Sequence, residues 1–201
     1  ATSGAMAQEQ TAPAPAEAPA AAIQVGGVTL TACQPDFGGF CGTISRPLDP
    51  AGKLPGTVTI GFEFYPHHDA GQPAEGVVLA QEGGPGYSST GTREGYLRLF
   101  EPLRGRRDVL LVDKRGTGLS DPIQCQALQE AGEFVPAAIA ACAKQLGPAA
   151  WMYGTAPAAD DVAAVLDALG IGKVDYYGDS YGTWFGQVFA QRHPDRLRTI
   201  V

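Results

Sequence analysis

The chain has 201 residues, 44% of them hydrophobic and 17% charged, with a formal net charge of −7. This length suits one domain or slightly more, and the hydrophobic fraction suffices for a core, which excludes a wholly disordered chain. No apolar run approaches the ~20 residues that span a bilayer, and an acidic balance without a Lys/Arg cluster argues against nucleic acid or an anionic membrane surface as a partner.

Residues 1–22 are rich in Ala, Pro, Gln and Glu and show no core-forming pattern. Such a composition predicts a flexible leader, so the structured region is expected over 23–201. The leader has no basic stretch followed by an apolar one, which indicates that any signal peptide has already been removed.

The four cysteines are Cys33, Cys41, Cys125 and Cys142. None lies in a C-x-x-C pair and no histidine stands at zinc-ligand spacing, so no metal site is predicted. Two local pairs suit the disulfides Cys33–Cys41 and Cys125–Cys142, and the alternative is four buried free thiols in a cytosolic protein. Together with the leader, the cysteines favour a secreted or cell-envelope protein.

Strands and helices are expected to alternate along the rest of the chain. Strands are predicted over 57–64, 77–81, 108–112 and 173–177, with a last one beginning at 199, and helices over 96–103, 158–169 and 180–192. The run at 108–112 is continuously apolar, which is typical of a strand buried on both faces. The alternation predicts an α/β protein with a mostly parallel sheet and helices on both faces.

A G-x-S-x-G sequence occupies 178–182, between a predicted strand and a predicted helix. Ser180 is the candidate nucleophile, because this strand-to-helix turn lifts its hydroxyl above the sheet. The positions of Gly178 and Gly182 are expected to require glycine, because the neighbouring backbone packs closely around the turn. The alternative is a serine in a glycine-rich turn without chemistry.

A second glycine-rich segment, EGGPG at 82–86, follows the predicted strand 77–81. Backbone N–H groups in such a turn can hold the oxyanion of an acyl-transfer reaction. The N–H after the nucleophile, that of Tyr181, is one expected donor, and Gly84 is the other. Pro85 has no N–H, and Gly83 completes the turn.

The third segment, DKRGTGLSDP at 113–122, directly follows the strand 108–112. It lacks the third glycine of a nucleotide-binding loop, so that interpretation is weak. Asp113 and Arg115 are instead predicted to brace the loop as a charge-assisted pair.

These three segments, in this order, resemble the α/β-hydrolase serine peptidases related to prolyl aminopeptidase, and most closely the secreted tripeptidyl aminopeptidase branch. The segment CGTISRPLD at 41–49 resembles that branch as well, and the resemblance covers about 33–201. It implies an α/β-hydrolase fold, a peptide substrate and no cofactor. Two positions depart from the family pattern: Glu82 stands where His is usual, which alters the polarity beside the oxyanion loop, and Lys114 stands where Gln is usual.

The fold family orders its triad as Ser, then Asp or Glu, then His. After Ser180 the chain offers only Asp195 and His193, and His193 is expected at the far end of the helix that begins at the nucleophile. His67 and His68 are predicted to be exposed at a hairpin end between edge strands. The catalytic Asp and His are therefore expected to lie outside this chain.

The resemblance also implies a cap domain after the strand that begins near 199. Residues 23–201 are thus expected to be the N-terminal part of a catalytic domain, an incomplete fold that a second chain or segment completes. The predicted function is a serine hydrolase that cleaves peptides from the N-terminus through an acyl-enzyme. A carboxylesterase or amidase is the alternative among enzymes, and a catalytically silent fragment or interaction module is the alternative of another class.

Overall fold

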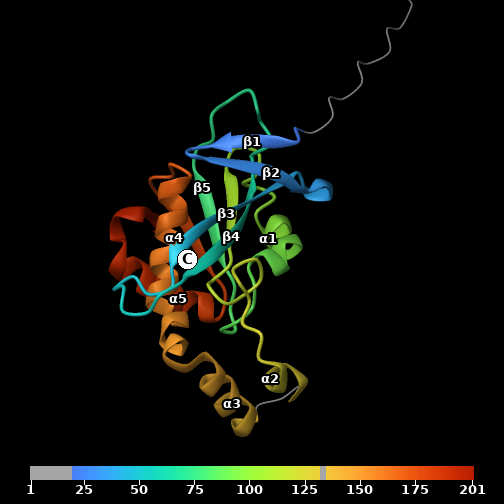
Figure 1. Ribbon diagram of the computed structural model, residues 1–201. Helices are drawn as coiled ribbons and strands as arrows, with labels where there is room; N and C mark the ends of the chain where they lie inside the picture. The colour runs from blue at the N-terminus through green and yellow to red at the C-terminus, as the bar shows by residue number, and fades with distance from the viewer. Residues whose placement is uncertain (1–19, 132–134) are drawn as a thin grey trace, which may run out of the picture.

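The computed structural model describes residues 20–131 and 135–201 (Figure 1), so most of the predicted leader lies outside the described residues. These residues form one eight-stranded sheet with the strand order β1-β2-β3-β4-β6-β5-β7-β8. The strands are β1 (Ala22–Val25), β2 (Val28–Gln34), β3 (Gly39–Pro47), β4 (Thr57–Tyr65), β5 (Val77–Gln81), β6 (Asp108–Val112), β7 (Val174–Gly178) and β8 (Leu197–Ile200).

The sheet has an antiparallel and a parallel half. From β1 to β6, each strand pairs antiparallel with its neighbour. The pairs β6–β5, β5–β7 and β7–β8 are parallel. The predicted parallel sheet is thus confirmed in the C-terminal half, which carries the three glycine-rich segments. The strands β1 to β4 follow one another without an intervening α-helix, which suits antiparallel pairing.

Helices cover both faces of the sheet, as predicted. The α-helices are α1 (Arg93–Leu99), α2 (Gln126–Ala131), α3 (Pro136–Leu146), α4 (Thr155–Ala168) and α5 (Tyr181–Arg192). Short 3-10 helices occupy Pro35–Phe37, Thr90–Thr92, Gly147–Tyr153 and Pro194–Arg196. The helix predicted over 96–103 instead begins at Arg93, and the chain continues after it as a series of turns up to Arg106.

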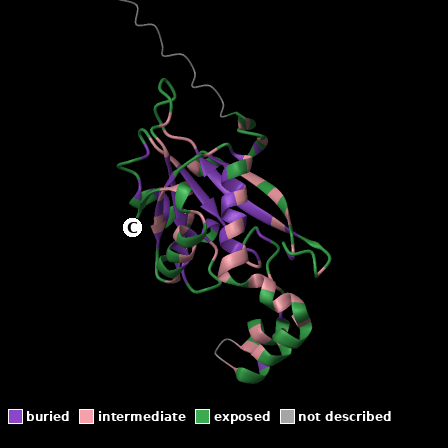
Figure 2. Ribbon diagram, turned by 90° about the vertical axis from the view of Figure 1, so that its left-hand side faces the viewer, coloured by how far each residue is buried: buried purple, intermediate pink, exposed green. Residues whose placement is uncertain are grey.

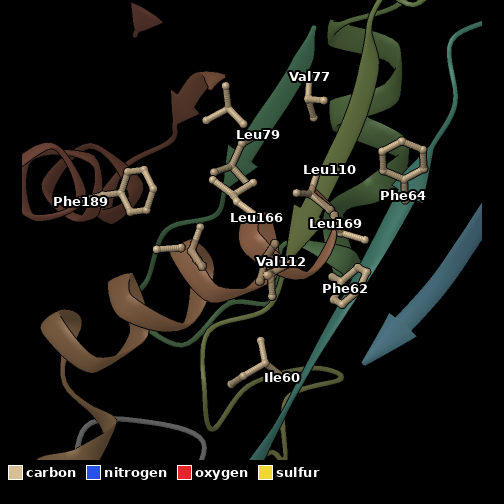
Figure 3. Packing of buried hydrophobic residues seen from close by; sticks show 14 of the residues in the cluster. Ile60, Phe62, Phe64, Val77, Leu79, Leu110, Val112, Leu166, Leu169 and Phe189 are labelled. Atoms are coloured by element: carbon tan, nitrogen blue, oxygen red, sulfur yellow. The ribbon is translucent and has the colours of Figure 1, made fainter. Parts of the chain in front are cut away.

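The central strands bury both faces because their side chains alternate between two cores. Leu79, Leu110 and Val112 point toward α4 and α5, where they pack in one cluster with Leu166 and Phe189 (Figure 3). The alternate residues of β5 and β6 face α1. They form a second cluster with residues of that helix and its C-terminal end, which contains Val78, Ala80, Val109, Leu111, Tyr96, Leu97 and Phe100. In Figure 2 the central strands are buried, and the helix α4 beside them is mostly buried or intermediate. The continuous apolar run of β6 is explained by this double coverage.

Both predicted disulfides are confirmed. Cys33–Cys41 joins β2 to β3, and Cys125–Cys142 joins the start of α2 to α3. The second bond lies in an arm of helices that extends away from the sheet (Figure 1). Within the two described stretches, no helix is long and apolar enough to cross a membrane.

Candidate active site

The three glycine-rich segments lie together because each follows one of three neighbouring strands. Glu82 follows β5, Asp113 follows β6 and Asp179 follows β7, and the carboxyl ends of parallel strands meet at one edge of the sheet. The Asp179 N–H donates to the Gln81 carbonyl oxygen at 3.1 Å, so the loops after β5 and β7 are joined directly beside Ser180.

Ser180 occupies a strained turn between β7 and α5. Its φ of 51° and ψ of −116° are a backbone conformation that L-residues other than glycine seldom adopt, and its side chain is exposed. The Gly182 N–H donates to the Asp179 carbonyl at 2.6 Å, and the Thr183 N–H donates to the Ser180 carbonyl at 3.0 Å. These bonds hold the serine at the N-terminus of α5, where the helix dipole favours negative charge.

Neighbouring backbone explains both glycines of the G-x-S-x-G sequence. A β-carbon at Gly178 would overlap the Gly182 carbonyl, and one at Gly182 would overlap the Gln81 carbonyl oxygen. The Tyr176 hydroxyl donates to the Gly182 carbonyl at 2.6 Å and fixes the turn from below. The expected close packing at these two positions is therefore confirmed.

The loop after β5 lies against the serine. A β-carbon at Gly83 would stand 2.7 Å from the Ser180 β-carbon, so only glycine fits there. The Gly83 N–H donates to Glu82 Oε1 at 2.8 Å. In the described part of the chain, the N–H groups of Gly84 and Tyr181 donate to no other protein group. The two N–H groups expected as oxyanion donors are thus without a protein acceptor in this part of the chain.

Lys114 is buried behind this loop, 6% exposed, and its Nζ donates to the Glu82 carbonyl oxygen at 2.8 Å. Burial lowers the pKa of Lys114 to about 8, although the charges of Asp113 and Glu82 oppose that shift. Burial alone would raise the pKa of Glu82, but the Gly83 N–H, the Tyr96 hydroxyl and the Lys114 charge outweigh it and lower that pKa. Glu82 is therefore an anion at neutral pH.

The predicted pairing of Asp113 with Arg115 is wrong. Arg115 instead forms a bidentate ion pair with Asp161 of α4. Asp113 accepts hydrogen bonds from the N–H and hydroxyl of Thr90 and from the Leu119 N–H. Each residue therefore stabilises the loop through a different neighbour. The two partners, Thr90 and Asp161, are distant from the loop in sequence and come close to it only in the folded protein.

The prediction for His67 is also wrong. His67 lies two residues after β4, a strand interior to the sheet, and its side chain is only 13% exposed, with Nδ1 2.7 Å from Asp108 Oδ1. Asp108 begins β6, so this pair lies at the end of the sheet opposite Ser180. The side chain of His68 is half-exposed, as expected.

His193 lies where the sequence places it, after the last residue of α5. A twelve-residue helix rises roughly 18 Å, which separates His193 from Ser180. The His193 Nε2 stands 2.9 Å from Asp160 Oδ1. All three histidines of the chain are thus engaged away from the candidate nucleophile.

A cavity of about 200 Å³ opens beside the turn, between the loops after β5 and β6 and the start of α4. Pro85, Lys114 and Tyr181 line it, together with Tyr153 and Thr155. The hydroxyls of Tyr181 and Thr155 lie 2.5 Å apart. Sequence reasoning missed Tyr153 and Thr155, since neither belongs to a motif and only the packing of α4 brings them here.

The side-chain atoms of Cys33, Cys41 and Glu63 that could bind a metal ion lie within 4.8 Å of one another. The two sulfurs are joined in a disulfide, and Glu63 is occupied by a bidentate contact with Arg93 and by the Tyr65 hydroxyl. This group therefore does not offer a metal site.

Comparison with known proteins places these features in context. A family model described as alpha/beta hydrolase fold matches residues 76–201. Serine protease Hip1 of Mycobacterium tuberculosis is 28% identical over 196 residues, which cover 82% of this chain and 35% of that protein. Tripeptidyl aminopeptidase of Streptomyces lividans is 26% identical over 185 residues, 80% of this chain and 34% of the enzyme.

Proline iminopeptidase of Neisseria gonorrhoeae is 26% identical over 133 residues, 66% of this chain and 34% of that protein. Among solved structures, a probable hydrolytic enzyme of Pseudomonas aeruginosa matches with a TM-score of 0.53 at 16% identity, covering 80% of this chain and 39% of its own. The chain spans about a third of the length of the curated relatives it matches.

Proposed function

Because the chain belongs to the alpha/beta hydrolase fold family, we propose that it carries the nucleophile and the oxyanion hole of a serine peptidase that acts at the N-terminus of peptides. The observation that carries this proposal is the turn at Ser180, where an exposed serine with a positive φ lies against the glycine-rich loop after β5. Relatives named as a serine protease and as aminopeptidases support the peptide substrate.

In the proposed reaction, Ser180 Oγ attacks the scissile carbonyl carbon and gives its proton to a histidine base. The N–H groups of Gly84 and Tyr181 hold the resulting oxyanion. The histidine returns the proton to the leaving amine as the C–N bond breaks, and an ester to Ser180 remains. Water then hydrolyses that ester and releases the N-terminal piece.

We assign the base and its acidic partner to polypeptide outside residues 1–201, either a further segment or a second chain. The three histidines of this chain support that assignment, because each is engaged by a carboxylate or lies far from Ser180. The proposal also places the protein outside the cytoplasm, since both cysteine pairs are oxidised and disulfides persist in oxidising compartments.

The test is labelling by a fluorophosphonate of the complete protein encoded by the gene. We expect labelling of Ser180 that disappears in Ser180→Ala and persists in Ser45→Ala, which changes an exposed serine of β3. Labelling that persists in Ser180→Ala would refute the nucleophile. Comparing tripeptidyl and aminoacyl arylamides with short-chain aryl esters as substrates separates a peptidase from an esterase.

A further inference from the structure

All the hydrogen-bonding groups of Glu82 have partners, and each partner comes from a different place. Its N–H donates to Ser89 Oγ at 3.1 Å, and its carbonyl oxygen accepts from Lys114 Nζ at 2.8 Å. Glu82 Oε1 accepts from the Gly83 N–H at 2.8 Å, and Oε2 accepts from the Tyr96 hydroxyl at 3.1 Å. The residue that leads into the oxyanion loop is thus fixed on its backbone and on its side chain.

The partners of Glu82 are themselves held firmly. Ser89 is fully buried, and Lys114 and Tyr96 are 6% and 5% exposed. The Tyr96 ring stacks on Phe100 and meets the edge of Tyr177, so α1 presents its hydroxyl from a packed aromatic cluster. The carboxylate therefore connects the loop after β5 to the buried aromatic residues of the second cluster.

The next two residues of the loop are glycines and have no side chain to anchor them. The φ of Gly84 is +101°, a backbone conformation that favours glycine, so contacts with neighbouring groups must set the direction of the two N–H groups. The bond from the Gly83 N–H to Glu82 turns that donor away from an incoming ligand. Of the two glycine N–H groups, only that of Gly84 has no protein acceptor, and it belongs to the loop that lies against Ser180.

We propose that the Glu82 carboxylate is a positioning residue that orients the Gly84 N–H as an oxyanion donor, an inference that rests on the proposed function. Without the carboxylate, the Gly83 N–H loses its acceptor and the loop loses its link to Tyr96. Both glycines can then rotate, which misaligns a donor that acts on the transition state. A role of this kind affects the rate of acylation and leaves substrate binding nearly unchanged.

The experiment compares Glu82→Ala, Glu82→Gln and Tyr96→Phe with the wild type in the complete protein. The readouts are the rate of phosphonylation by a fluorophosphonate, and kcat and KM for a peptidyl arylamide. Glu82→Ala is expected to lower the phosphonylation rate and kcat at least tenfold, since loss of one oxyanion donor costs ~10²–10³ in kcat. Its KM is expected to stay within about threefold of the wild-type value. Glu82→Gln keeps an oxygen that accepts from Gly83 and should recover most of the rate. Tyr96→Phe loses the hydrogen bond to Glu82 Oε2, and its rates are expected to lie between those of the wild type and Glu82→Ala.

Glu94→Ala is the matched control, because Glu94 is an exposed glutamate of α1. Wild-type rates in Glu82→Ala, or equal losses in Glu82→Ala and Glu82→Gln, would overturn the positioning role while the labelling of Ser180 keeps the proposed function. If Glu82→Ala does not fold, wild-type rates in Tyr96→Phe overturn the role instead. Failure of the wild type to be labelled at Ser180 would overturn the proposed function itself.

Discussion

Arg115 and Asp161 form a bidentate ion pair inside the protein, with Nε 2.6 Å from Oδ2 and Nη2 2.8 Å from Oδ1. Their side chains are 0% and 2% exposed. Arg115 Nη1 also donates to the carbonyl oxygens of Leu48 and Met152, so one guanidinium joins the loop after β6 to three other segments. This contact holds α4 at the edge of the sheet where the cavity lies.

Asp161→Ala is expected to lower the free energy of unfolding by about 3–5 kcal/mol, because it leaves the Arg115 charge buried without its carboxylate. Urea unfolding of the complete protein measures the change. Asp195→Ala is the matched control: the Asp195 side chain is 78% exposed and lies 3.7 Å from Arg196, so its loss should cost less than about 1 kcal/mol. Equal effects of the two substitutions would contradict the role given to the buried pair.

Gly182→Ala is expected to destabilise the protein by about 1–3 kcal/mol, because the new methyl group would overlap the Gln81 carbonyl oxygen and force the backbone apart. The shift displaces the turn at Ser180, so the rate of fluorophosphonate labelling should fall as well. Gly95→Ala is the control within α1, where a β-carbon has open space and helix propensity favours alanine. Gly182→Ala with wild-type stability and labelling would show that the turn tolerates a side chain.

The parts of the fold that the sequence predicted are those with local signals. The predicted bounds of β5 and β6 are correct to the residue, because continuous apolar runs end at glycine-rich or charged segments. The strands β1 and β2 and the helices α2 and α3 were not predicted. Their side chains are mostly exposed or half-buried, so their sequences lack a clear apolar period.

The candidate site also combines features that a local sequence signal predicts with features that depend on packing. The turn at Ser180 and its two glycines follow from a spacing of five residues, whereas the partner of Arg115 depends on where α4 packs. The burial of His67 likewise depends on β4 pairing with β6 in the middle of the sheet. No local pattern contains that pairing, and so the sequence placed this histidine at an exposed edge.

The stability of the protein should depend on pH through His67. The hydrogen bond to Asp108 raises the pKa of His67, helped by the Gln72 carbonyl and opposed by burial. A raised pKa in the folded state stabilises it below the unfolded value of about 6.5, and this contribution is lost as pH rises through the folded pKa. His67→Gln should remove that decline in the free energy of unfolding, measured by urea unfolding from pH 5.5 to 8.

His68→Gln is the matched control for this experiment, since the neighbouring ring is half-exposed. It is expected to keep the pH dependence of the wild type. If His67→Gln and the wild type have parallel stability profiles in that window, the pair with Asp108 does not contribute.

The lowered pKa of Lys114 is expected to change the free energy of unfolding with pH in the direction opposite to that of His67. Burial lowers its pKa to about 8 from 10.5, so between those values the unfolded chain binds more protons than the folded one. The free energy of unfolding should therefore rise with pH in this window, by at most about 1.4 kcal/mol per pH unit from this group. Lys114→Met keeps a long apolar side chain and should lose that increment in urea unfolding between pH 8 and 10. Lys173→Met, at an exposed lysine before β7, should retain it. The same slope in wild type and Lys114→Met would mean that the buried amine keeps its ordinary affinity for protons.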